Sequence, residues 1–239
     1  MIPKKIHYCW FGKKPLPELA LECIESWHKH MPDWEYTLWN ESNFDIGFNN
    51  YCKEAYDAGK FAFVSDIARL VALKNVGGLY LDVDFKVFKS FEGLLGYKAF
   101  AGFEGSKYSP VMMGVCASEP NGEWVSEALK AYDNRHFIKP DGGVDLTTNV
   151  AFITQIMASN GFRQDGTEQD YLDCHIFPVD YFCPRHTTGE YIRTKNTYCE
   201  HKGLGSWNGS AGNWKVKLLN LLGQSSRTRL IKIKRALIG

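Results

Sequence analysis

Apolar and polar positions along the chain follow two spacings, one typical of strands and one typical of helices. Residues 4–10 and 35–39 are short, mostly apolar segments that predict strands, and residues 16–30 predict a helix with proline in its first turn. Residues 61–75 carry apolar side chains at helical spacing, and the glycine pair at 77–78 predicts the end of that helix.

The same alternation continues through the rest of the chain. Strands are predicted at 79–87, 99–103 and 111–117, helices at 123–134 and 148–160, and short strands with loops up to residue 207. Strands that alternate with helices indicate an α/β domain, whose ligands bind beyond the carboxyl ends of the strands. The sequence thus predicts one α/β domain over 1–213, large enough for a catalytic domain, and a helical C-terminal appendix over 214–239.

Composition and charge narrow the class of protein. The chain has 239 residues, of which 44% are hydrophobic and 23% charged, so disordered, collagen-like and coiled-coil proteins are excluded. The 28 basic and 27 acidic residues nearly cancel. Seven of the basic residues and none of the acidic ones lie in 215–239, which leaves 21 basic against 27 acidic residues, a net charge of −6, on residues 1–214.

The seven cysteines are scattered and include no C-x-x-C pair, which argues against a disulfide framework and a structural zinc site. Buried thiols in a reducing compartment are the expectation. No signal peptide and no apolar run long enough to cross a membrane is visible. We therefore expect a cytoplasmic protein, either soluble or attached peripherally to the inner face of the cytoplasmic membrane.

The acidic residues of the predicted strand 79–87 are the first candidates for chemistry. Because side chains alternate along a strand, Tyr80, Asp82 and Asp84 are predicted on one face and the apolar residues on the other. Two carboxylates on one face suit a divalent cation with a diphosphate. The alternative is the solvated outer face of an edge strand. Aspartate is disfavoured inside strands, so something must compensate for it here.

A second polar group lies on the preceding predicted helix. Ser65, Asp66 and Arg69 lie within one turn of each other, away from the apolar stripe. One interpretation is an ordinary surface ion pair. The other is a buried acid–guanidinium pair beside the metal, which would bind a sugar hydroxyl and a phosphate.

The order of these segments resembles glycosyltransferase family 32. The resemblance rests on Ile6–Gly12, Ser65–Arg69, Gly77–Asp84 and a C-terminal block that runs from Thr197 to His201 and closes with Gly205–Trp207. It covers about residues 2–208. The family includes bacterial capsular polysaccharide transferases and is related to the glucosylating domains of large clostridial toxins.

The resemblance implies a GT-A-type nucleotide-sugar transferase fold, with a Rossmann-like central sheet flanked by helices. It also implies a UDP-sugar donor, Mn²⁺ or Mg²⁺, and retention of the anomeric configuration. The implied donor-binding residues are Trp10 (stacked on uracil), Ser65, Asp66, Arg69, Tyr80, Asp82, Ser206 and Trp207. The implied metal ligands are Asp84, Asp82 and His201, and the residues that act on the reacting groups are Asp66, Arg69, Asp82 and Trp207.

Three of these side chains have a structural alternative. Trp10 could be a core residue at a strand end, His201 an ordinary packed histidine, and Trp207 a packing anchor. The stretch 147–150 departs from the family pattern, because many relatives have Gly-Pro where this chain has Asn149-Val150. That stretch is expected to face the acceptor, so the resemblance does not identify the acceptor.

The basic C-terminal segment has two apolar stripes at helical spacing, formed by Trp214, Leu218, Leu221 and Leu222 and by Leu230, Ile233 and Leu237. Interleaved with basic residues, they predict an amphipathic pair of helices that meets anionic lipid. The alternative is a helix that packs on the catalytic domain. Nucleic acid is not an expected partner, because the body has no basic patch with interleaved aromatic residues.

The sequence therefore predicts a metal-dependent, retaining hexosyltransferase. Its expected acceptor is a glycan or lipid-linked glycan of surface polysaccharide synthesis, of the capsular or lipopolysaccharide type. A toxin-like transferase acting on a protein, a metal-dependent nucleotide-sugar phosphohydrolase and a non-catalytic nucleotide-sugar binding module are the competing hypotheses.

Overall fold

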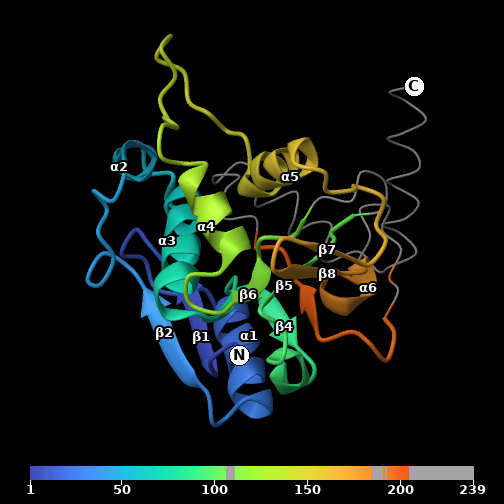
Figure 1. Ribbon diagram of the computed structural model, residues 1–239. Coiled ribbons are helices and arrows are strands. Elements are labelled where there is room, and N and C mark those ends of the chain that lie inside the picture. Colours follow the sequence, from blue (N-terminus) through green and yellow to red (C-terminus); the bar gives the residue numbers. More distant parts are fainter. Residues whose placement is uncertain (106–110, 185–190, 192, 205–239) are drawn as a thin grey trace, which may run out of the picture.

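A mixed seven-stranded sheet forms the centre of the molecule, with strand order β2-β1-β3-β6-β5-β8-β7 (Figure 1). The computed structural model describes residues 1–105, 111–184, 191 and 193–204. The strands of the sheet are β1 Lys5–Cys9, β2 Glu35–Trp39, β3 Gly78–Leu81, β5 Ala99–Gly102, β6 Val115–Ser118, β7 Gln169–Tyr171 and β8 Cys174–Phe177. Strand β1 is parallel to β2 and β3, and β5 is parallel to β8. The remaining pairs are antiparallel.

Helices flank this sheet, and a small second sheet lies beside it. The helices are α1 Glu18–His30, α2 Asn50–Asp57, α3 Phe61–Val76, α4 Glu123–Lys130, α5 Asn149–Ser159, α6 Val179–Phe182 and the 3₁₀ turn Glu92–Leu94. The second sheet pairs β4 Phe85–Val87 with β9 Cys199–His201 in antiparallel register. No helix within the described ranges is long and apolar enough to cross a membrane.

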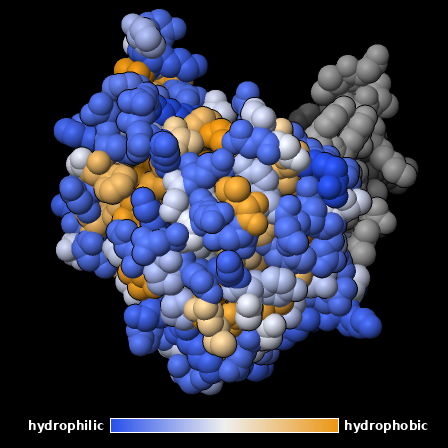
Figure 2. All heavy atoms as spheres, viewed as in Figure 1, coloured by the Kyte–Doolittle hydropathy of each residue, from blue (hydrophilic) through white to orange (hydrophobic). Residues whose placement is uncertain are grey.

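Two apolar clusters lie on opposite faces of the sheet. Alternation along the strands sends Tyr80 and Cys116 into a cluster with α2, α3, α4 and α5. Their strand neighbours Leu79, Leu81 and Val115 enter the other cluster, together with α1, β4 and α6. All seven cysteines are buried, as the sequence predicts. The surface seen in Figure 2 is mostly hydrophilic, with separate apolar groups.

Most predicted elements are confirmed, with small changes at their ends. The first helix begins at Glu18 because Pro17 is extended and serves as its N-cap. Helix α3 ends at Gly77, which has φ of +69°, a conformation that glycine adopts without strain. Helix α2 is an addition that the sequence pattern did not predict, and the side chain of Asn49 caps it by accepting from Cys52 N at 2.8 Å.

The predicted continuous strand 79–87 is wrong. Strand β3 stops at Leu81, and a turn closed by Phe85 N donating to Asp82 O at 3.0 Å separates it from β4. Strand β3 is also central, between β1 and β6, so it is not a solvated edge strand. The physical reason is that Asp82 and Asp84 have partners on different sides of the turn, which a regular strand could not bring to both carboxylates, as described next.

Candidate active site

The candidate site lies at the carboxyl ends of β1 and β3, the side of an α/β sheet where ligands bind. Helix α3 ends directly before β3 and packs on β1 and β3, so it runs antiparallel to these strands and its first turns lie at this same edge. The described residues among those predicted from the sequence therefore come together from four places: the end of β1, the start of α3, the turn between β3 and β4, and β9.

A buried ion-pair network connects α3 with the acidic turn. Arg69 Nη2 lies 2.9 Å from Asp66 Oδ1 and 3.4 Å from Asp82 Oδ1, and Arg69 Nη1 donates to Met113 O at 2.6 Å. The side chains of Arg69 and Asp66 are only 6% and 9% exposed. The surface ion-pair interpretation is therefore wrong, and the buried acid–guanidinium pair is the one found. Burial raises the pKa of Asp66 to about 7, although Arg69 opposes this shift.

Asp82 is held from two sides but remains partly open. Tyr80, which is fully buried, donates its hydroxyl to Asp82 Oδ1 at 2.8 Å, and Arg69 lies on the same oxygen. The Asp82 side chain is 34% exposed. A Cβ at Gly114, directly before β6, would lie 2.8 Å from Asp82 Oδ2, so glycine at this position leaves room for the carboxylate. The arrangement presents one oriented carboxylate to a ligand.

Asp84 belongs to a different network. Its Oδ2 accepts from Leu204 N at 2.7 Å and lies 3.0 Å from Nε2 of His201. The His201 ring stacks on Phe85 with centroids 4.7 Å apart, across the β4–β9 pair. Burial lowers the pKa of His201, but Asp84 outweighs burial and raises that pKa to about 9. Burial raises the pKa of Asp84, but the interaction with His201 outweighs burial and lowers this pKa below its ordinary value.

A divalent cation fits one part of this arrangement. Nε2 of His201 and Oδ2 of Asp84 lie 3.0 Å apart, a separation at which both atoms could bind one ion in place of the hydrogen bond between them. Within the described ranges, no group of three His, Cys, Asp or Glu side chains is arranged to hold a metal. Two protein ligands with oxygen and nitrogen atoms would leave further coordination positions for diphosphate oxygens, which suits Mn²⁺ or Mg²⁺.

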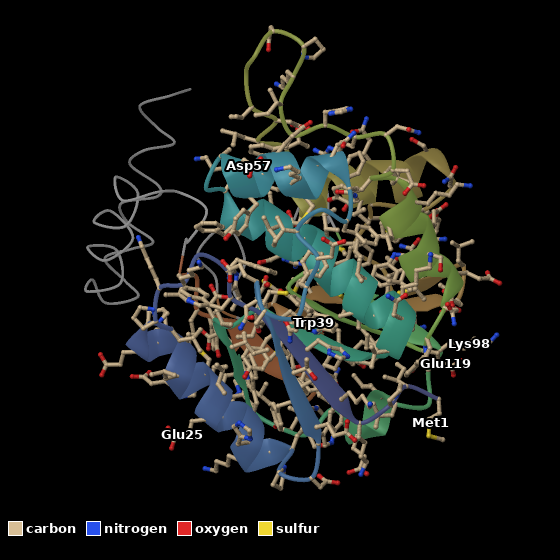
Figure 3. All side chains as sticks on the ribbon, turned by 90° about the vertical axis from the view of Figure 1, so that its left-hand side faces the viewer. Met1, Glu25, Trp39, Asp57, Lys98 and Glu119 are labelled. Atoms are coloured by element: carbon tan, nitrogen blue, oxygen red, sulfur yellow. The ribbon has the colours of Figure 1, made fainter. Side chains whose placement is uncertain are left out.

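Trp10 lies directly after β1 and is half-buried, which is not the environment of a core tryptophan. Its backbone N–H donates to Trp39 O at 3.0 Å, and its indole N–H donates to Lys14 O at 2.6 Å. Figure 3 labels Trp39, at the end of β2. One face of a fixed indole at the carboxyl edge of the sheet is suited to stack on a base.

The other residues predicted from the sequence are Ser65, Ser206, Trp207 and the stretch 147–150. Ser65 is half-buried and its hydroxyl donates to Phe61 O at 3.1 Å, a bond within α3. Ser206 and Trp207 lie outside the described residues, as do the predicted helices of 214–239. In the stretch expected to face the acceptor, Thr148 caps α5 and Asn149 is buried at its first turn.

Two acidic residues of this region were missed from the sequence. Glu104 follows β5, and the charges of His201 and Asp82 both influence its pKa, which burial raises. Glu41 follows β2 and accepts from the backbone of Gly12, next to the Trp10 segment. Their common signal was available in the sequence: each is the first carboxylate after the end of a predicted strand.

This combination of a mixed sheet, buried Asp66–Arg69 pair and Asp-x-Asp turn at the strand ends defines a GT-A-type glycosyltransferase fold. Residues 17–101 match the family model described as the glycosyltransferase sugar-binding region containing the DXD motif. The resemblance to DXD-motif glycosyltransferases predicted from the sequence is thereby confirmed.

Individual relatives agree with this assignment. The chain is 36% identical over 175 residues to Glucan organizing enzyme 1 of Cryptococcus neoformans, covering 60% of this chain and 46% of that protein. It is 27% identical over 154 residues to Inositol phosphoceramide mannosyltransferase 1 of Schizosaccharomyces pombe, covering 58% and 46%. The chain thus spans about half the length of these curated relatives. Among solved structures, PaToxG glycosyltransferase has a TM-score of 0.52 at 20% identity, covering 67% of this chain and 70% of that one, which supports the fold.

Proposed function

We propose that the chain is a metal-dependent, retaining glycosyltransferase that moves a hexose from a UDP-sugar to a glycan or lipid-linked glycan. The observation that carries this proposal is the buried Asp66–Arg69–Asp82 network beside Asp84, in a region that matches DXD-motif glycosyltransferases. A surface polysaccharide intermediate is the proposed acceptor, on the resemblance of the motifs to capsular transferases.

The proposed roles follow from what each side chain can reach. Trp10 stacks on the base, which is worth about 1–3 kcal/mol for base–aromatic contacts in general. Asp82, partly exposed, accepts hydrogen bonds from hydroxyl groups of the ribose and sugar. Arg69 faces protein acceptors, so it positions Asp66 and Asp82 and adds positive charge near the diphosphate.

Asp84 and His201 would hold the divalent cation. When bound, that ion stabilises negative charge on the leaving diphosphate. Ser206 and Trp207 are proposed to complete the phosphate and glycosidic-oxygen site, on the basis of the sequence resemblance alone. The proposed place of work is the cytoplasmic face of a membrane, with the basic residues of 215–239 meeting anionic lipid.

A second candidate donor is a GDP-linked mannose. The observation that favours it is the similarity to a fungal protein named as a mannosyltransferase of inositol phosphoceramide. The two candidates share the fold and the acidic turn and differ in the base and sugar that bind. A phosphohydrolase would use the same carboxylates but would not need a stacking tryptophan at position 10.

The test is incubation of the protein with Mn²⁺ and a panel that includes UDP-glucose, UDP-galactose, UDP-N-acetylglucosamine and GDP-mannose. A transferase without its acceptor should slowly release the nucleoside diphosphate and free sugar from one donor. Release of sugar 1-phosphate and nucleoside monophosphate would instead identify a phosphohydrolase. No release and no binding of any donor would overturn the proposal.

A further inference from the structure

The segment that follows β1 has a strained but fixed path. Gly12 has φ of +93° and Lys13 has φ of +58°, so two successive residues lie in the left-handed region. A Cβ at Gly12 would lie 2.4 Å from the Phe61 ring, so only glycine fits between this segment and the start of α3. Backbone of this kind persists only where the surroundings impose it.

Glu41 supplies much of that restraint. Its Oε1 accepts from Gly12 N at 2.7 Å and from the hydroxyl of Tyr56 at 3.2 Å. Burial favours the neutral acid, but these hydrogen bonds outweigh it and lower the pKa of Glu41, so the carboxylate is ionised. Glu41 thus connects the loop after β2 and helix α2 to the segment after β1.

The indole of Trp10 depends on the same segment. Its backbone N–H bonds to Trp39 O, on the strand that also leads to Glu41, and its ring N–H bonds to Lys14 O. The two ends of the turn, residues 10 and 14, are therefore linked through the indole itself, and residue 12 between them is held by Glu41. Fixing Gly12 consequently fixes the carbonyl that orients the ring.

We infer that Glu41 is a positioning residue for nucleotide binding: its carboxylate holds Gly12 and so orients the Trp10 ring before the base arrives. The inference rests on the proposed function, since it needs Trp10 to stack on a base. Without an acceptor at position 41, the Gly12 N–H loses its partner and the strained turn is free to relax. The ring would then have to be ordered during binding, which weakens affinity.

The experiment measures binding of two probes to the full chain by calorimetry in the presence of Mn²⁺. One probe is UDP and the other is inorganic pyrophosphate, which offers the same phosphates without a base. For Glu41→Ala, Kd for UDP should rise at least about five-fold, a part of the stacking contribution. Kd for pyrophosphate should stay within about two-fold. Glu41→Gln should restore UDP affinity, because its amide oxygen can accept the Gly12 N–H.

Glu54→Ala is the matched control. Glu54 also accepts from a backbone N–H, that of Ile138 at 2.9 Å, and pairs with His136, but it serves a different loop. Its loss should change neither Kd by more than about two-fold. Should Glu41→Ala fail to fold, Tyr56→Phe removes one partner of Glu41 and should give a smaller loss confined to UDP.

Three results would overturn the inference. Equal weakening of UDP and pyrophosphate would show a general structural effect, and a loss in Glu54→Ala as large as in Glu41→Ala would remove its specificity. Unchanged UDP affinity in a folded Glu41→Ala or Tyr56→Phe chain would show that the Trp10 ring needs no such support. In these cases the proposed function stands, whereas a wild-type chain that binds neither UDP nor GDP defeats both.

Discussion

Asp82 and Asp84 are two residues apart, yet their carboxylates belong to different networks. Asp82 faces Arg69 and Tyr80, on the side of α3, whereas Asp84 faces His201 and Leu204, on the side of β9. The intervening Val83 is buried, so the turn points the two acids to opposite partners. One acid therefore cannot replace the other, and substitutions of Asp82 and of Asp84 should have different effects.

Replacing Asp84 with asparagine should lower turnover at least about 10²-fold, comparable to losing one key electrostatic stabiliser. Asparagine keeps an oxygen that can accept from Leu204 N, so the chain should still fold, but the loss of the ion pair with His201 should lower the melting temperature by a few degrees. Donor hydrolysis with added Mn²⁺, together with thermal unfolding, checks both parts. Asp33→Asn, an exposed partner of Lys4, is the control. Near-normal turnover of the wild type in excess chelator would contradict the metal and the ligand together.

Replacing Arg69 with methionine should destabilise the fold by about 3–5 kcal/mol, because Asp66 would then have to bind a proton or remain charged without its buried partner. Urea unfolding measures the effect. The double variant Asp66→Asn/Arg69→Met should recover part of the loss, since asparagine has neither a charge to bury nor a proton to take up. Arg163→Met removes an exposed pair with Asp165 and should change stability by less than about 1 kcal/mol. Similar losses in both arginine variants would contradict the buried network.

The segment between α4 and α5 contains a partly buried ion pair. Arg135 Nη2 lies 2.7 Å from Asp145 Oδ2, and the guanidinium lies 3.7 Å from the Phe152 ring centre. A bridge between Ile138 and Val144 closes the segment into a hairpin-like loop. The same loop leads into Thr148 and Asn149, at the start of α5, so its stability bears on the stretch expected to face the acceptor.

This ion pair should appear in the acid stability of the protein. Burial raises the pKa of Asp145, but hydrogen bonds from Thr147 and Arg135 outweigh burial and lower this pKa below its ordinary value. A lowered folded-state pKa gives stability that is present above the unfolded value, about 3.9, and is lost as the pH falls through the folded value. At neutral pH, Asp145→Asn should be less stable by about 1 kcal/mol or more.

Urea unfolding from about pH 2 to pH 7 tests this sign. The difference between wild type and Asp145→Asn should vanish at the acid end and reach its full value above about pH 5. Asp133→Asn, an exposed neighbour, should run parallel to the wild type. A stability difference between wild type and Asp145→Asn that grows as the pH falls would contradict a lowered pKa of Asp145.

Several elements could be predicted from the sequence because local patterns determine them. Helix α3 has apolar spacing and a glycine stop, and β1 and β2 are short apolar segments between turns. The break between β3 and β4 was missed because Phe85 and Val87 continue the apolar alternation of Leu79 and Leu81. That break depends on His201 and Leu204, more than a hundred residues away, which no local pattern contains.

The site was predicted in part for the same reason. From the order of the motifs, Trp10, Asp66, Arg69 and the two aspartates of the turn were predicted to share one region. The structure places all five at one edge of the sheet. Whether the Asp66–Arg69 pair is buried could not follow from its spacing, because Met113 and Asp82 supply the surrounding partners. Glu104 and Glu41 were missed because their one signal, a carboxylate just after a predicted strand, is common and does not single out a site residue.

The charge of the whole molecule is divided unevenly along the chain. Residues 1–214 carry a net charge of −6, and the seven Lys and Arg residues of 215–239 have no acidic neighbours. An anionic lipid surface repels the net negative charge of residues 1–214, so we expect electrostatic attachment to come from the basic segment. Each basic residue near such a surface contributes about 1 kcal/mol, and this attraction falls off within a Debye length.

Deleting residues 214–239 should therefore abolish sedimentation of the protein with anionic vesicles and leave hydrolysis of the donor unchanged. Vesicles of phosphatidylserine and phosphatidylcholine are compared with phosphatidylcholine alone, at low and high salt. Binding of the full chain should require the anionic lipid and weaken as salt rises, because surface attraction is screened. The deleted segment also contains Trp214 and leucines at helical spacing, which could instead pack on the catalytic domain. If the truncated chain is insoluble or unfolded, that packing is its role, and the acidic domain has no membrane anchor in this segment.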